Sequence, residues 1–204
     1  MKTTLGQLHL WINGSKMTAD ASFDGVSTDT RLVGAGNLFV ALKGENFDAH
    51  DFLAELPKKG VAAVVAERIP ENYPLPALIV ADTRLALGDM AREWRRNFSI
   101  PVVGVTGSNG KTTTKELISR TLKRKYRVAV TQGNFNNHIG VPLTLLAMDR
   151  SAEFGVVEMG ASHCGEIALL CSIAQPDFGL ITNIGKAHLE GFGGIEGVMR
   201  GKGE

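Results

Sequence analysis

The chain has 204 residues, of which 44% are hydrophobic and 21% are charged, and its formal net charge is +1. This length allows one large or two modest domains. The chain lacks the excess of basic residues that is typical of nucleic-acid-binding proteins. The first residues, MKTTLGQLHLWING, have polar breaks that exclude a signal sequence or a membrane span. We therefore expect a cytoplasmic, monomeric protein without nucleic-acid partners or membrane insertion.

The first part of the chain alternates short apolar runs with polar turns. Residues 3–13 have helical spacing. Apolar and β-branched runs predict strands, and they occupy residues 26–30, 37–44, 61–67 and 76–82. A short helix is expected at 48–60, and the spacing of Leu87, Met90, Ala91, Trp94 and Phe98 predicts a helix that links two domains. We place the first domain at residues 1–83 and the second at 84–204.

From Pro101 onward the pattern becomes a regular alternation of strand, loop and helix. Apolar strands are expected near 100–107, 127–132, 154–160 and 178–185, with helices at 111–125 and 165–174. Such alternation indicates a parallel sheet with crossover helices. We thus predict an α/β fold, in which a small mixed α/β domain precedes a parallel-sheet domain. The final IEGVMRGKGE begins a helix and stops without a cap, so we expect this to be the front part of a longer protein.

The stretch VVGVTGSNGKTTTKE, residues 102–116, has the features of an anion site. A strand ends in a glycine turn and a helix begins, which presents backbone amides and a positive helix end. The generic phosphate loop would need glycine at position 105, where Val105 stands, so the strict pattern fails. Lys111 can nevertheless reach terminal phosphates and Thr112 can ligate magnesium. The alternative is a glycine turn with a capping threonine. The expected ATP-binding residues are Gly107, Ser108, Asn109, Gly110, Lys111, Thr112 and Thr113.

Two further candidates follow apolar strands. Glu158 ends the run FGVVE, so its carboxylate is expected at the carboxyl edge of the sheet, where it can hold magnesium. A helix-capping or solvated glutamate is the alternative. His188 follows the next apolar strand by four residues and suits a second-metal ligand or a phosphate contact. It could equally be a structural loop histidine.

The spelling T-G-x-N-G-K-T at 106–112 resembles the ATP loop of the Mur ligases and of folylpolyglutamate synthetase. Segments 133–146, 156–167 and 183–193 resemble the Mur ligases that join D-alanyl-D-alanine to UDP-N-acetylmuramoyl-tripeptide. The resemblance implies an ATP-dependent amide ligase of peptidoglycan synthesis, with its C-terminal domain absent here and its ATPase domain incomplete. ATP would phosphorylate the tripeptide carboxylate, and the dipeptide amine would displace phosphate from the acyl phosphate. The alternatives are a Mur ligase that adds a single amino acid, and a non-catalytic nucleotide-binding switch.

The same resemblance implies ATP with two magnesium sites. It assigns catalytic roles to Lys111, Glu158, His188 and Lys202, and metal ligation to Thr112, Glu158 and His188. A lysine matching Lys202 is carbamylated in the family, and its carboxylate helps to hold the second magnesium. From the residues alone, Lys202 reads as a solvated helix lysine.

Residues 27–31 and 36–52 resemble the segment that holds the UDP part of the substrate in these ligases. The substrate-binding residues this implies are Ser27, Asp29, Thr30, Arg31, Lys43 and Gly44. Asp29 and Arg31 could instead form a structural pair in a turn. Asn137 and His138 are expected to contact substrate or nucleotide, with a turn-forming asparagine as the alternative.

Overall fold

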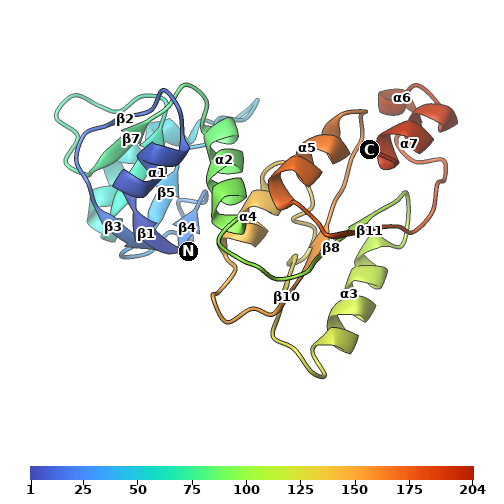
Figure 1. Ribbon diagram of the computed structural model, residues 1–204. Helices are drawn as coiled ribbons and strands as arrows, with labels where there is room; N and C mark the ends of the chain where they lie inside the picture. The colour runs from blue at the N-terminus through green and yellow to red at the C-terminus, as the bar shows by residue number, and fades with distance from the viewer. The chain divides into compact units, whose positions relative to one another are not determined.

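The computed structural model describes residues 1–204, and the chain folds into two compact units, Met1–Glu93 and Trp94–Glu204 (Figure 1). The boundary expected after residue 83 therefore moves to 93/94. Helix α2 (Thr83–Arg95) is the reason, since it begins within the first unit and its last two residues belong to the second. The amide and hydroxyl of Thr83 both donate to Glu67 Oε1, at 3.1 and 3.2 Å.

The first unit is built on a five-stranded sheet with the order β2-β7-β6-β5-β4. The strands β4 to β7 are parallel to their neighbours, and β2 is antiparallel to β7. Their bounds are β2 Lys16–Met17, β4 Val26–Ser27, β5 Leu38–Val40, β6 Ala63–Ala66 and β7 Ala77–Ile79. The four expected strands are present but shorter. Strand β2 and the antiparallel pair β1 (Lys2–Thr4) and β3 (Ser22–Asp24) were not expected, because two or three mixed residues carry no periodic signal.

Two local caps define the helices of this unit. In α1 (Leu5–Trp11), the Thr4 hydroxyl accepts the N–H of Gln7, which is an N-cap bond. The segment Ala49–Lys59 is a 3-10 helix, η1. Gly60 ends η1 in the left-handed conformation at φ 69°. The buried core between η1 and the sheet contains Phe39, Ala41, Leu53, Leu56, Val64 and Ala66.

The second unit is a four-stranded sheet in the order β11-β8-β10-β9, with every pair parallel. This confirms the parallel sheet predicted from the sequence. The strands are β8 Val102–Thr106, β9 Val128–Val130, β10 Phe154–Glu158 and β11 Phe178–Ile181. Glu158 pairs in register with Val105, and Ile181 with Thr106. The carboxyl ends of β8, β10 and β11 therefore meet at one edge of the sheet.

The helices lie on both faces of this sheet. Figure 1 shows α3 (Lys111–Leu122) on one face and α4 (Gly140–Leu146) and α5 (Glu166–Ala174) on the other. The short α6 (Leu189–Phe192) and α7 (Ile195–Lys202) follow β11. None of the helices in the molecule has the length and apolar character needed to cross a bilayer. The placement of α3 opposite α4 and α5 follows from right-handed crossovers running in opposite directions along the sheet.

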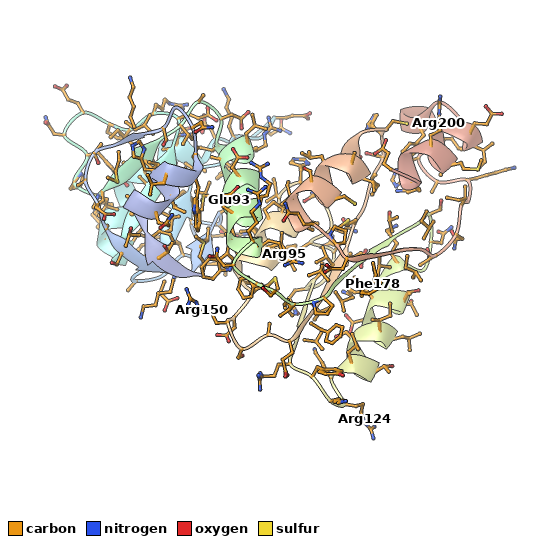
Figure 2. The ribbon with its side chains drawn as sticks, in the orientation of Figure 1. Glu93, Arg95, Arg124, Arg150, Phe178 and Arg200 are labelled. Atoms are coloured by element: carbon orange, nitrogen blue, oxygen red, sulfur yellow. The ribbon has the colours of Figure 1, made fainter.

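Arg95 fixes the start of the second unit (Figure 2). Its buried guanidinium donates to Phe98 O at 2.6 Å and Ala174 O at 3.1 Å, and it lies 3.3 Å from Asp177 Oδ2. The same Asp177 oxygen accepts the N–H of Val102 at 2.8 Å, where β8 begins. One arginine thus ties the segment before β8, the strand that leads to the phosphate loop, to the segment before β11.

Candidate active site

The loop between β8 and α3 has the strand-to-helix geometry that the sequence predicts. Gly107 and Gly110 have φ of +135° and +77°, which side chains rarely adopt, and Gly110 directly precedes Lys111 at the start of α3. The N–H groups of Ser108 and Asn109 donate to Asn183, at 3.0 and 3.1 Å. Asn183 lies beyond the carboxyl end of the neighbouring strand β11. Asn183 thus holds the loop in place. The N–H groups in the first turn of α3 have no hydrogen-bond partner within the helix, so they can bind a ligand.

Lys111 folds back onto this loop. Its Nζ donates to Gly107 O at 2.8 Å and lies 3.5 Å from Ser108 O. The ammonium therefore rests on the same backbone that a phosphate chain would contact.

Glu158 meets Thr112 at the edge of the sheet. The Thr112 hydroxyl donates to Glu158 Oε1 at 3.2 Å, and Asn136 Nδ2 donates to the same oxygen at 2.9 Å. Glu158 is 1% exposed, and its other oxygen, Oε2, is buried without a hydrogen-bond partner. The alternative of a solvated glutamate is therefore wrong. Asn136 was not among the expected site residues, because its contact with Glu158 joins residues 22 positions apart in the sequence.

This donor set fits magnesium. The ion takes oxygen ligands, and proteins commonly supply one or two side chains while substrate phosphates supply the rest. Beside the phosphate loop, the Thr112 hydroxyl lies 3.2 Å from Glu158 Oε1, and the other oxygen of this carboxylate, Oε2, is buried without a hydrogen-bond partner. The molecule contains no group of three or more His, Cys, Asp or Glu side chains that would bind a metal alone. One hydroxyl and one carboxylate leave the remaining ligand positions of a magnesium ion to phosphate oxygens and water.

Lys115 is a neighbour of Glu158 that the sequence analysis missed. Its side chain is fully buried, with Nζ 2.8 Å from Thr131 O and 3.9 Å from Glu158 Oε2. The available signal was its position three residues after Thr112 and four after Lys111, which places it near the same helix face. A lysine on a mostly polar helix otherwise reads as solvated.

A cavity of about 410 Å³ adjoins the loop and brings together several residues expected at the site. It is lined by Lys111, Asn136, Asn137, His138, Gly160, Ala161, Ser162, Glu166, Leu169, Leu170 and His188. His188 is exposed and has φ of 54°, immediately before α6. Lys111, Asn137, His138 and His188 thus share one cavity, although they come from three separate segments.

Asn137 has a structural task as well as its place in the cavity. Its Oδ1 accepts the N–H groups of Ile139 and Gly140, at 3.0 and 2.9 Å, where α4 begins. This is the turn-forming alternative raised for the residue. The side chain also lines the cavity, so its contact with substrate or nucleotide stays a prediction.

Lys202 is buried, which corrects its interpretation as a solvated helix lysine. It is 2% exposed, and Nζ donates to Ala161 O at 2.7 Å and lies 5.2 Å from the centre of the Phe192 ring. Burial, reinforced by the charge of Lys111, lowers the pKa of Lys202 to about 8. Ala161 lines the cavity, so Lys202 lies just behind its wall.

Glu166 is a second residue that the sequence analysis did not single out. Its Oε2 accepts the N–H of Ser162 at 2.6 Å and of His163 at 3.0 Å. Burial acts to raise the pKa of Glu166, but these bonds outweigh it and the pKa is lowered. The carboxylate is therefore an anion on the cavity wall opposite in charge to Lys111.

The segment 27–31 of the first unit lines a separate cavity of about 620 Å³. Its lining residues are Thr28, Asp29, Thr30, Arg31, Phe47 and Phe52. Asp29 and Arg31 also form the ion pair raised as the alternative, with Nη2 and Oδ2 2.6 Å apart. The hydrogen bonds from the Arg31 side chain and backbone lower the pKa of Asp29 to about 2. Ser27 supports the turn by accepting the N–H of Asp29 at 3.2 Å.

Lys43 and Gly44 lie outside the lining of this cavity. The Gly44 N–H donates to Phe47 O at 2.8 Å, and Lys43 forms an isolated β-bridge with Asp48. The Gly44 N–H closes its own turn and is therefore not available to a substrate. Neither residue lines the cavity formed by 28–31.

The parallel sheet and its glycine loop define an α/β protein of the phosphate-loop, nucleotide-binding class. Two family models match the sequence: the Mur ligase family, catalytic domain, over residues 22–95, and the Mur ligase middle domain over residues 105–204. The chain belongs to the Mur ligase family.

Individual relatives agree with this assignment. The chain is 46% identical over 204 residues to a UDP-N-acetylmuramoyl-tripeptide–D-alanyl-D-alanine ligase from Escherichia coli, covering 100% of this chain and 45% of the relative. It is 48% identical over 182 residues to the Bacillus subtilis enzyme of that name, covering 87% of this chain and 39% of the relative. The chain thus spans less than half the length of these relatives.

Solved structures show the same fold. MurF from Acinetobacter baumannii superposes with a TM-score of 0.92 at 39% identity, covering 99% of this chain and 45% of that protein. MurF ligase from Thermotoga maritima in complex with ADP gives 0.80 at 44% identity, covering 87% of this chain and 42% of that protein.

Proposed function

We propose that this chain forms the substrate- and ATP-binding part of a ligase that joins D-alanyl-D-alanine to UDP-N-acetylmuramoyl-tripeptide. The observation that carries the proposal is the contact between Thr112 and Glu158, which puts a carboxylate with a free oxygen beside the phosphate loop. The names of the relatives from Escherichia coli and Bacillus subtilis support the choice of substrates. A cytoplasmic location and a monomeric state are part of the same proposal.

The nucleotide is proposed to lie along residues 107–113. The ADP complex of the Thermotoga maritima protein supports nucleotide binding in this family. Lys111 would exchange its bond to Gly107 O for the terminal phosphates, where its charge helps phosphoryl transfer. Amides at the start of α3 would contact the same phosphates.

Magnesium is proposed at Thr112 and Glu158, and a second ion near His188 and Lys202. When bound, magnesium neutralises charge that develops on the phosphates during transfer. His188 supports the second site because it lines the cavity beside Lys111. Lys202 supports it through its lowered pKa and its place behind Ala161, since a neutral amine is the form that reacts with carbon dioxide. A mass increment on Lys202 matching a carbamate, lost on acidification, tests that part.

The reaction in this cavity would be carboxylate activation followed by amide formation. The tripeptide carboxylate attacks the terminal phosphorus of ATP, ADP leaves, and an acyl phosphate forms. The dipeptide amine then attacks the acyl carbon, loses its proton, and releases phosphate. Lys111, Asn137 and His138 line the space and are proposed to orient the reacting groups, since positioning and charge supply most of the rate in such transfers.

In the first unit, the cavity at 28–31 is proposed to hold the UDP part of the substrate. The Arg31 side chain is 86% exposed, so it can reach a diphosphate without leaving a buried position. Phe47 and Phe52, whose rings stack with centres 5.2 Å apart, offer an apolar wall for a base.

A panel of amine acceptors tests the function. The natural full-length protein is incubated with ATP, UDP-N-acetylmuramoyl-tripeptide and either D-alanyl-D-alanine or single amino acids, and phosphate release is measured. We expect release that requires both the tripeptide and D-alanyl-D-alanine. Release with a single amino acid instead would indicate another ligase of the family. Nucleotide binding without substrate-dependent release would indicate a switch.

A further inference from the structure

Lys115 is a buried cation beside a buried anion, and the proposed function gives it no task. The side chains of Lys115 and Glu158 are each 1% exposed, and Nζ lies 3.9 Å from Glu158 Oε2. Lysine is almost never fully buried unless it is paired, because an isolated ammonium loses its hydration. Lys115 therefore needs an anion. Two carboxylates are within reach: the half-exposed Glu116, with Oε1 at 3.1 Å, and the buried Glu158, with Oε2 at 3.9 Å.

The hydrogens of the Lys115 ammonium are directed at other oxygens. Nζ donates to Thr131 O at 2.8 Å and lies 3.4 Å from Gly133 O, and Glu116 Oε1 lies at 3.1 Å. An ammonium has three donors, and these three oxygens account for them. The interaction between Lys115 and Glu158 is thus one of charge, without a hydrogen bond.

Glu158 is held in place through Oε1, the oxygen that does not face Lys115. Thr112 and Asn136 donate to Oε1, whereas Oε2 is buried and has no hydrogen-bond partner. A buried carboxylate oxygen without a partner is costly unless a charge compensates it or a ligand completes it. Lys115 compensates the charge of Glu158 and leaves the lone pairs of Oε2 free.

We propose that Lys115 is a positioning residue that acts as the resident counter-ion of Glu158 and makes metal binding depend on nucleotide. The ammonium keeps the carboxylate stable while the site holds no metal. It also repels a bare divalent cation at Oε2, because the two positive charges would lie only a few ångströms apart. Phosphate oxygens from a nucleotide would supply the negative charge that offsets this repulsion. The inference rests on the proposed role of Glu158 as a magnesium ligand.

Manganese binding tests this directly, with the ion itself as the probe. Free Mn²⁺ is measured by electron paramagnetic resonance, with and without ADP, in the purified wild type, Lys115→Met and Lys123→Met. Without ADP, Lys115→Met is expected to bind Mn²⁺ at least about tenfold more tightly than the wild type. The factor by which ADP strengthens Mn²⁺ binding should shrink accordingly. Lys123→Met, at the exposed end of the same helix, should match the wild type.

Three more variants separate the possible failures. Glu158→Gln should weaken Mn²⁺ binding in the presence of ADP, and unchanged binding there would overturn the magnesium site itself. If Glu158→Gln does weaken Mn²⁺ binding, equal Mn²⁺ affinities of the wild type and Lys115→Met without ADP would overturn only the counter-ion role of Lys115. Lys115→Arg keeps the charge and should keep the wild-type dependence on ADP. If Lys115→Met does not fold, Lys115→Gln removes the charge while its amide still donates to Thr131 O, and the same comparison decides.

Discussion

At the scale of single residues, the site depends on the two oxygens of Glu158. Oε1 is held by Thr112 and Asn136, and Oε2 is left without a hydrogen bond inside the protein. A carboxylate held in this way does not have to reorganise when a ligand arrives, which is the preorganisation that charge-stabilising sites require. Glu158 thus joins the phosphate loop to the loop that carries Asn136.

Replacing Lys111 by alanine tests the phosphate loop. We expect the rate of phosphate release in the full-length protein to fall at least about 100-fold, the scale of losing one preorganised charge contact. Lys123→Ala, an exposed lysine at the end of the same helix, is the matched control and should stay near the wild-type rate. Near-normal turnover in Lys111→Ala would show that the loop does not drive the transfer.

The ion pair of Asp29 and Arg31 gives a prediction about pH. The side-chain hydrogen bond from Arg31 holds the pKa of Asp29 at about 2, below its ordinary value of 3.8. The pair therefore contributes to stability above about pH 4, and that contribution is lost as the pH falls through about 2. Carbon NMR titration of the Asp29 carboxyl should show its pKa rising toward 3.8 in Arg31→Ala. An unchanged pKa in this variant would contradict the pairing.

The sequence predicted site residues where the neighbouring residues indicate their chemistry. Lys111 and Thr112 follow a glycine turn, and Glu158 ends an apolar strand. Lys115 and Lys202 were missed or misread, because their burial comes from contacts with Thr131 and Ala161, which lie 16 and 41 residues away. The helical spacing of residues does not show which polar side chain will be covered by a loop from a distant part of the chain.

At the scale of elements, the strands of the parallel sheet were predicted because runs such as VVGVT and FGVVE are apolar on both faces. Helix α4 was not predicted. Its sequence, GVPLTLL, begins with glycine and has proline in the first turn, where proline does not break hydrogen bonds. The Asn137 side chain bonds the N–H groups of Ile139 and Gly140 where α4 begins. An asparagine is equally typical of a turn, so its presence in the sequence does not indicate that a helix follows.

The cap of α4 can be tested by Asn137→Ala. Losing the two bonds to the N–H groups of Ile139 and Gly140 should lower the free energy of unfolding by about 1 kcal/mol. Urea unfolding measures this, with Asn134→Ala in the same exposed loop as the control. Equal stability of the two variants would mean that the cap does not hold α4.

At the scale of the whole molecule, the proposed functions divide between the two compact units. The cavity at residues 28–31 belongs to Met1–Glu93, and the phosphate loop belongs to Trp94–Glu204. The sequence indicated two domains from the change of pattern near Pro101. The compact units divide at Glu93 and Trp94 and not after residue 83, where the sequence placed the boundary. The contact of Thr83 with Glu67, which ties the start of α2 to the first unit, joins residues distant in sequence.

This division predicts that the two binding sites respond to separate variants. Arg31→Ala should weaken binding of a UDP-muramyl peptide about tenfold, the scale of one charge-assisted contact. Binding of ADP should stay unchanged. Isothermal titration with each ligand measures both effects, and the reverse pattern is expected for Lys111→Ala. Loss of ADP affinity in Arg31→Ala would contradict the separation of sites.

In the proposed site, the loop at residues 107–112 holds the phosphates and Glu158 holds their metal. Crystals grown with ADP and Mn²⁺, measured at the manganese absorption edge, test it most directly. We predict an anomalous peak bonded to Glu158 Oε2 and Thr112 Oγ1, with the diphosphate over the start of α3. A diphosphate bound elsewhere, or a manganese peak away from Glu158, would contradict the account.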